Sequence, residues 1–249
     1  NEVIELTEFL TPKGRPIPAE SRSHDRWFQH LAIVVSDMEK AYQHLRQHRV
    51  PQTSPNPQTL PAWNPTAGGI QAFYFKDLDG HNLELIQFPP DKGDPKWQQA
   101  TEALFLGIDH TAIVVADTVA SRAFYCDQLG MQLQQESQNS GLEQERLSGV
   151  SEAQVQISSL KASTGLGLEL LEYIRPNDGR MMPADTHPND LWVCQTAIVV
   201  QKTTTAAQQL ALPASIMSSV VVVSEPVLGF KQGFLMPDPD GHLLQIVLE

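Results

Sequence analysis

Short runs of apolar residues recur along the chain at wide intervals. The run AIVV occurs at residues 32–35, 112–115 and 197–200. Short runs rich in β-branched residues predict buried strands. The first two runs follow a histidine by two positions and the third follows a glutamine. The pattern therefore predicts three similar strands, each with a polar residue near its start.

Each of the first two strands is followed by a stretch with helical periodicity. Asp37 and Asp117 are residues of the kind that cap a helix N-terminus, and Gly130 is of the kind that ends one. Apolar residues after Asp37 recur at helical spacing, at Met38, Ala41, Tyr42 and Leu45. We therefore expect a helix after each of these strands.

Further strands follow the predicted helices. The segments IQAFYF and HNLELIQF flank an Asp79–Gly80 turn, which predicts a β-hairpin. Near the end of the chain, SSVVVV, QGFLM and HLLQIVL also predict strands. The repeating unit is therefore a strand, a helix and three more strands (βαβββ).

The chain also repeats on a longer scale. Residues 4–35 align with residues 168–200 with one inserted residue, which pairs Glu5 with Glu169 and Arg15 with Arg180. Residues 3–10 match the last strand of a unit, so we expect the first unit to be truncated, with roughly 60 leading residues absent. Residues 88–107 are rich in proline, glycine and charge and predict a linker. We therefore predict two domains, residues 1–100 and residues 101–249.

Composition excludes several classes of function. The chain has 249 residues and a formal net charge of −12, which disfavours nucleic acid as a partner. Its apolar runs are shorter than the roughly 20 residues that cross a bilayer, so we expect no membrane partner and a cytoplasmic protein. Cys126 and Cys194 form no zinc-binding spacing and are interpreted as buried thiols. Phosphate-binding and serine-hydrolase motifs are absent from the sequence.

The nested units, with SRAFYCDQLGM on a helix, LELLEY in a last strand and PDPDGHLLQI at a hairpin, resemble the vicinal oxygen chelate superfamily. That group includes glyoxalases, bleomycin resistance proteins and extradiol dioxygenases. The resemblance implies an α+β fold in which paired βαβββ modules form two glyoxalase-like open-barrel domains. It also implies one divalent metal ion per cup (Fe, Mn, Ni, Zn or Co), with ligands from the first and last strands of each module.

Three residues stand at the position that the resemblance assigns to the first-strand ligand. His30, Ala32 and Val34 share one strand face, so His30 can point into a cup. His110 holds the same place in the second repeat and Gln195 in the third. The alternatives are a core histidine for the first two, and a structural or substrate-binding amide for Gln195.

The last-strand ligand positions fall on acids and on one glutamine. They are Glu5, Glu84, Glu169 and Gln245. An acid between leucines is expensive to bury without a partner, which favours a metal beside it. Grouped by domain, the first cup would hold Glu5, His30 and Glu84 together with one residue of the absent first strand. The second would hold His110, Glu169, Gln195 and Gln245. The second cup either binds a metal weakly or is a degenerate domain.

The resemblance implies a metal-dependent enzyme that binds two oxygens of a small-molecule substrate. The reaction would be that of a lyase, an isomerase or a ring-cleaving dioxygenase, with Glu84 or Glu5 as ligand or proton acceptor. The alternative is a non-catalytic binding or resistance protein of the same fold. A homodimer is left open. His81 and His242 follow Asp-Gly turns and are expected to be exposed.

Overall fold

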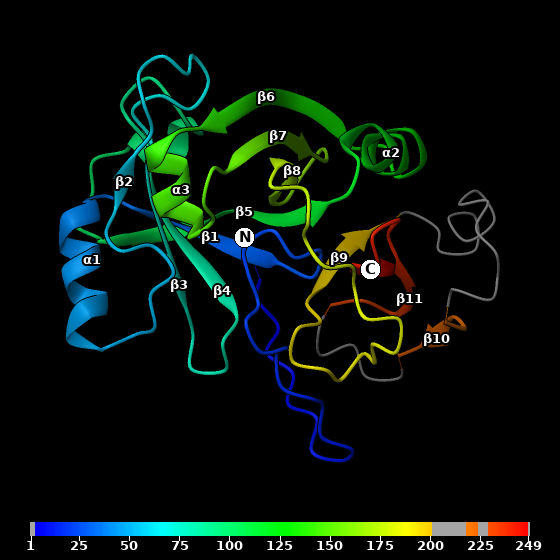
Figure 1. Cartoon of the computed structure of the whole chain (residues 1–249). Helices are drawn as coiled ribbons and strands as arrows, with labels where there is room; N and C mark the ends of the chain where they lie inside the picture. Colours follow the sequence, from blue (N-terminus) through cyan, green and yellow to red (C-terminus); the bar gives the residue numbers. More distant parts are fainter. Residues whose placement is uncertain (1–2, 201–217, 224–228, 249) are drawn as a thin grey trace.

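The computed structural model describes residues 3–200, 218–223 and 229–248, and it contains two β-sheets (Figure 1). The larger sheet has eight strands in the order β2-β3-β4-β1-β5-β8-β7-β6. The smaller has four strands in the order β10-β11-β12-β9. The predicted α+β class is confirmed, and so is the pairing of βαβββ units, which takes place in the larger sheet.

The first complete unit follows the predicted plan. Its elements are β1 (Gln29–Val35), α1 (Met38–Gln47), β2 (Gln58–Thr59), β3 (Gln71–Lys76) and β4 (Asn82–Gln87). Asp37 caps α1, because its side chain accepts a hydrogen bond from the Lys40 N–H. Met38, Ala41 and Tyr42 bury the inner side of α1 against Phe73 and Leu85 of the sheet.

The second unit adds one helix that the apolar pattern did not predict. Its elements are β5 (Phe105–Val115), α2 (Thr118–Arg122), η2 (Ala123–Gln128), β6 (Gln132–Ser140), α3 (Leu142–Ser148), β7 (Gln154–Lys161) and β8 (Gly167–Arg175). Helix α3 carries Leu147 into a core with Phe28, Tyr74, Ala112 and Leu171. It therefore fills part of the concave side of the large sheet.

The third unit supplies the smaller sheet, with strands β9 (Gln195–Val199), β10 (Val221–Val222), β11 (Gln232–Pro237) and β12 (Leu243–Leu248). The segment expected to hold its helix lies outside the described residues. Phe234, Met236 and Ile246 of this sheet share a core with Ile113 and Tyr125 of the second unit. The smaller sheet is thus packed behind β5 and η2, away from the concave face.

The two halves of the large sheet join at an antiparallel pairing of β1 with β5. Parallel pairs then flank this junction, β1 with β4 and β5 with β8. The arrangement is close to a two-fold repeat about the β1–β5 junction. It contradicts the expected grouping of residues into cups, because the first complete unit pairs with the second across residue 101. The domain limits at residues 100 and 101 remain a prediction.

The predicted linker is folded against the sheet. It contains the short helix η1 (Pro95–Gln98), and its Trp97 packs beside Ala32, Val34 and Ile86. The Trp97 indole also lies so close to Gly107 that a Cβ at that glycine would stand 3.0 Å from it. The linker therefore covers one end of the concave face.

The segment that precedes β1 and the segment that precedes β9 are joined by two equivalent ion pairs. Arg15 binds the buried carboxylate of Asp190 through Nε and Nη2, and Arg180 binds the buried carboxylate of Asp25 in the same way. Each guanidinium also lies over a tryptophan, Arg15 over Trp192 at 4.9 Å and Arg180 over Trp27 at 4.7 Å. These arginines therefore hold the two segments against each other.

Residues 3–10 were expected to form the last strand of a truncated unit. The structure assigns no strand there, and Val3, Leu6 and Leu10 are exposed. Within the described part of the chain, the helices are too short and too polar to span a bilayer.

Candidate metal centre

Two histidines and one glutamate meet on the concave face of the large sheet. His30 of β1, Glu84 of β4 and His110 of β5 place one ligand atom each within 4.8 Å of one another. Glu84 Oε2 lies 3.1 Å from His30 Nε2 and 3.6 Å from His110 Nε2. All three residues are buried, at 2%, 5% and 4% exposure. The linker and α3, which pack on the same face, shield this part of the sheet.

The strand register explains why these side chains converge. Ala32 lies opposite His110 and beside Glu84, while Ala112 lies opposite His30 and beside Glu169. In a sheet, neighbouring residues in register point to the same face. Small alanines at the centre of this face leave the space into which the four polar side chains extend.

Glu169 of β8 completes a set of two histidines and two glutamates. Its Oε2 lies 3.5 Å from His110 Nε2, and its Oε1 accepts a hydrogen bond of 2.6 Å from the Ser159 hydroxyl. The side chain is 20% exposed, so it is the most accessible of the four. His110 can approach β8 closely because Gly167 lies opposite it, where a Cβ would stand 3.2 Å from the His110 Cβ.

The charges in the cluster support one another. Burial alone would raise the pKa of the Glu84 carboxyl, but the His110 and His30 imidazoles outweigh burial and lower that pKa to about 2. Burial would lower the pKa of His110, but the carboxylates of Glu169, Asp109 and Glu84 raise it well above its usual value. The carboxylate of Glu84 thus stays charged although it is buried, because of the imidazoles beside it.

The cluster fits a divalent metal ion. Within the described residues, His30 Nε2 and His110 Nε2 are buried and have no hydrogen-bond partner of acceptable geometry, although both face Glu84. Buried polar atoms without partners are rare and call for an explanation. Imidazole nitrogens together with carboxylate oxygens are the ligands that first-row divalent ions accept.

Asp109 and Trp97 adjoin the cluster and were not identified from the sequence. Asp109 Oδ2 lies 3.0 Å from His110 Nδ1, and Asp109 Oδ1 accepts a hydrogen bond of 2.6 Å from the Trp97 indole N–H. Burial would raise the pKa of Asp109, but the contacts with His110 and Trp97 help to lower it. The Asp-His pair in DHTAIVV was the available signal, because a carboxylate next to a ligand histidine often orients it.

Three predicted ligands lie elsewhere. Glu5 is exposed on the N-terminal segment, where its Oε1 accepts a hydrogen bond from the Thr7 hydroxyl, so the expected convergence of Glu5 with His30 and Glu84 is wrong. Gln195 is exposed on β9, and Gln245 lies on β12 in register with Ala197. The last two repeat the geometry of one half of the cluster, but in the smaller sheet and with neutral amides.

Two further histidines were expected to be exposed turn residues. His81 is partly buried and pairs with Asp77 in the turn before β4. His242 is buried, with Nε2 2.8 Å from the Val114 carbonyl oxygen, so its predicted exposure is wrong. It connects the turn before β12 to β5 behind the concave face.

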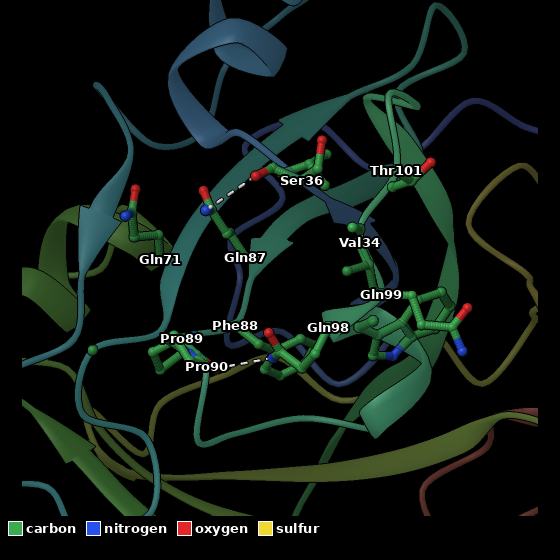
Figure 2. A pocket seen from close by; sticks show the side chains of 14 residues that line it. Val34, Ser36, Gln71, Gln87, Phe88, Pro89, Pro90, Gln98, Gln99 and Thr101 are labelled. Atoms are coloured by element: carbon green, nitrogen blue, oxygen red, sulfur yellow. Dashed lines mark hydrogen bonds between the residues drawn. The ribbon is translucent and has the colours of Figure 1, made fainter.

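A pocket of about 500 Å³ opens between the end of β1 and the linker (Figure 2). Val34, Gln71 and Gln87 line it from the sheet, and the segment from Trp97 to Thr101 lines it from the linker. Gln87 and Gln98 are bound to the carbonyl oxygens of Ser36 and Pro89 (Figure 2). Trp97 lines this pocket and also contacts Asp109, so it lies between the pocket and the metal-ligand cluster.

Comparisons with known proteins agree with this arrangement. The sequence profile of the Glyoxalase/Bleomycin resistance protein/Dioxygenase superfamily matches residues 1–85 and 107–201. The chain is similar to glyoxalase I from Zea mays, with a TM-score of 0.55, 19% sequence identity, and coverage of 88% of this chain and 66% of that chain. It is also similar to a candidate dioxygenase from Bacillus subtilis, with a TM-score of 0.51, 13% identity, and coverage of 90% and 62%.

The chain thus spans just under two thirds of the length of both similar structures. No curated protein sequence matches it significantly. The profile covers most of the chain, the structural likeness covers 88% and 90% of it, and two βαβββ units pair in the larger sheet, although the sequence pattern predicted other partners. The chain therefore belongs to the Glyoxalase/Bleomycin resistance protein/Dioxygenase superfamily.

Proposed function

We propose that the chain binds one divalent metal ion with His30, Glu84, His110 and Glu169 and acts on a small substrate that offers two adjacent oxygen atoms. The observation that carries this proposal is the pair of buried Nε2 atoms without hydrogen-bond partners, both facing Glu84. When bound, the metal would polarise a substrate carbonyl and stabilise negative charge on its oxygen.

Glu84 and Glu169 have different environments and so suit different roles. Glu84 lies between two imidazoles and is almost fully buried, which fixes it as a ligand. Glu169 is partly exposed, and its second oxygen is held by Ser159. A carboxylate that has room to move can take a proton from the carbon next to a carbonyl and return it to the adjacent carbon. Glu169 is therefore the proton acceptor in our proposal, in place of Glu5.

This assignment favours an isomerase or a lyase. The proton leaves the substrate carbon for Glu169, the electron pair of the broken C–H bond moves toward the polarised oxygen, and the same proton is available for return. Ser159 would orient the carboxylate through its hydrogen bond to Oε1. No external oxidant or reductant is needed for this transfer.

A ring-cleaving dioxygenase is the second candidate. His30, His110 and Glu84 form a group of two histidines and one carboxylate that does not require Glu169. That donor set is typical of non-haem iron(II) oxygenases, which leave further metal positions open. The role of Glu169 therefore decides between the two candidates.

Metal analysis tests the proposal directly. The purified chain is stripped with a chelator, reloaded with Ni²⁺, Co²⁺, Zn²⁺, Mn²⁺ or Fe²⁺, and analysed for tightly bound metal. We expect about one ion per chain, lost in His30→Ala and His110→Ala. His48→Ala, a matched change at an exposed histidine on the surface, should keep it. A chelated chain that takes up no metal would overturn the proposal and leave a non-catalytic binding protein.

Two assays then separate the candidate reactions. An isomerase or lyase would exchange the proton next to the carbonyl of an α-hydroxyketone or α-ketoaldehyde adduct with deuterium from solvent, and Glu169→Gln would abolish this exchange. A dioxygenase loaded with Fe²⁺ would consume oxygen in the presence of a catechol, and would keep at least part of this activity in Glu169→Gln.

A further inference from the structure

The two histidines of the cluster occupy equivalent places in the sheet but differ in what holds them. His110 Nδ1 lies 3.0 Å from the Asp109 carboxylate. His30 Nδ1 is buried and has no hydrogen-bond partner among the described residues, and its ring contacts Tyr74 and Phe28 instead. The residue that precedes His30 is Gln29, whose amide is bound to Thr111 and Thr196. Of the two rings, His110 therefore has a carboxylate beside its Nδ1 atom, and His30 has none among the described residues.

Asp109 is held in turn by the linker. The Trp97 indole N–H donates to Asp109 Oδ1 at 2.6 Å, which leaves Oδ2 for His110. Trp97 is itself fixed by packing on Ala32, Val34 and Ile86 and by its close approach to Gly107. The chain of contacts thus runs from the linker through Trp97 and Asp109 to the ring of His110.

We propose that Asp109 and Trp97 are positioning residues for His110, so that docking of the linker sets the orientation of one metal ligand. A carboxylate that accepts from Nδ1–H fixes the tautomer in which Nε2 carries the lone pair, and Nε2 is the atom that faces Glu84 and Glu169. This inference rests on the metal site proposed above. It adds that the linker between the two halves of the sheet is part of that site.

The first test compares Co²⁺ affinity in Asp109→Asn, Trp97→Phe and the unmodified chain. Loss of a second-sphere carboxylate typically weakens metal binding 10- to 100-fold, and we expect this for Asp109→Asn. Trp97→Phe keeps most of the apolar packing and removes only the N–H donor, so it should weaken binding less. The matched control is Asp178→Asn, which changes another acid bound to a buried histidine, His24, outside the cluster. That variant should bind Co²⁺ like the unmodified chain.

The second test reads the orientation of His110 without metal. In metal-free protein labelled with ¹⁵N-histidine, at a pH high enough for the His110 ring to be neutral, its ring signals should report the tautomer protonated at Nδ1. Asp109→Asn should shift these signals toward a mixture of tautomers and leave those of His30 in place. Unchanged His110 signals would overturn the positioning role even if the variant folded poorly enough to weaken metal binding.

The two tests distinguish failure of the positioning role from failure of the metal site. If the unmodified chain binds Co²⁺ and Asp109→Asn binds it equally tightly, the positioning role fails and the metal site stands. If the unmodified chain binds no divalent metal, the metal site fails and the positioning role fails with it. A weakened Asp109→Asn, a milder Trp97→Phe and an unaffected Asp178→Asn would support the inference.

Discussion

Ala32 of β1 lies directly opposite His110 of β5, at the centre of the face that carries the metal-ligand cluster. Ala32 is fully buried, and Glu84 is its neighbour in register on the other side. A larger residue here would occupy the space between His110 and Glu84. The small side chain of Ala32 therefore leaves the space in which the polar side chains meet.

We predict that Ala32→Val displaces the ligand side chains and lowers affinity for Co²⁺ at least tenfold. Overpacking should also reduce the free energy of unfolding by about 1–3 kcal/mol. Equilibrium dialysis measures the first effect and urea unfolding the second. Ala41→Val is the control, because Ala41 is equally buried but lies on α1 behind the sheet. It should lose stability and keep Co²⁺ binding; equal loss of binding in both variants would show a merely structural effect.

The pair of glutamines on the smaller sheet, Gln195 and Gln245, should hold no tightly bound metal. Gln195 and Gln245 replace a histidine and a glutamate there, and amides are weaker ligands than imidazole and carboxylate. We expect Gln195→Ala, Gln245→Ala and Glu5→Ala each to keep about one metal ion per chain by elemental analysis. A variant of this group that lost the ion would show that the smaller sheet or the N-terminal segment supplies a ligand.

The ion pair between the buried carboxylate of Asp25 and the partly exposed Arg180 should make the fold sensitive to acid. Burial alone would raise the pKa of Asp25, but Arg180 and the backbone N–H of Arg22 lower it below the value of about 3.9 in an unfolded chain. The unfolded state therefore binds more protons as the pH falls. Stability from this carboxylate is complete above about pH 5 and is lost as the pH drops through its lower folded pKa.

Replacement of this aspartate should reduce stability at neutral pH. We predict that Asp25→Asn lowers the free energy of unfolding by about 2 kcal/mol at pH 7, since it weakens hydrogen bonds to a charged group. The difference from the unmodified chain should shrink toward pH 3. Asp185→Asn, which breaks the exposed contact of Arg15 with Asp185, should change stability by less than about 1 kcal/mol. A constant difference from pH 7 to pH 3 would contradict the assignment.

A loop of the first unit closes over the far edge of the sheet. Asn64 is buried, and its side-chain amide donates to Asn139 Oδ1 of β6 at 2.7 Å while its oxygen accepts from the Thr66 and Ala67 N–H groups. We predict that Asn64→Ala frees this loop and raises amide hydrogen exchange over residues 60–69. The free energy of unfolding should fall by about 1–3 kcal/mol. Unchanged exchange in this segment would show that other contacts hold the loop.

The sequence predicts the helices and strands of this fold better than it predicts which strands pair with each other. Alternation in HLAIVV places His30 and Ala32 on one face, and Asp37 caps a helix as expected. These are local properties of a few neighbouring residues. The pairing of β1 with β5 joins residues about 80 positions apart, and no local pattern distinguishes it from a pairing with another repeat of the same strand. The four candidate ligands were therefore identified individually but grouped wrongly.

Other parts of the site depend on contacts that spacing does not reveal. Trp97 lies in a segment whose composition predicts a plain linker, yet its indole reaches Asp109 through tertiary packing. Glu5 has a sequence neighbourhood similar to that of Glu169, but in the described part of the chain it lies in no strand and so on no sheet face. The position of a residue in a repeat thus predicts which ligand atom it can offer. Whether that atom reaches the cluster depends on the strand pairing around the residue.

The ladder that joins β1 to β5 also has a consequence for how the protein is made. His30 and Glu84 leave the ribosome first, and the chain between Glu84 and Glu169 takes roughly 4–17 s to synthesise at about 5–20 residues per second. At the start of that interval a nascent chain carries two of the four candidate ligands, and after His110 it carries three. The proposed four-residue site would therefore be complete only after translation of β8, and the ion available at that later moment would decide which form of the protein the cell obtains.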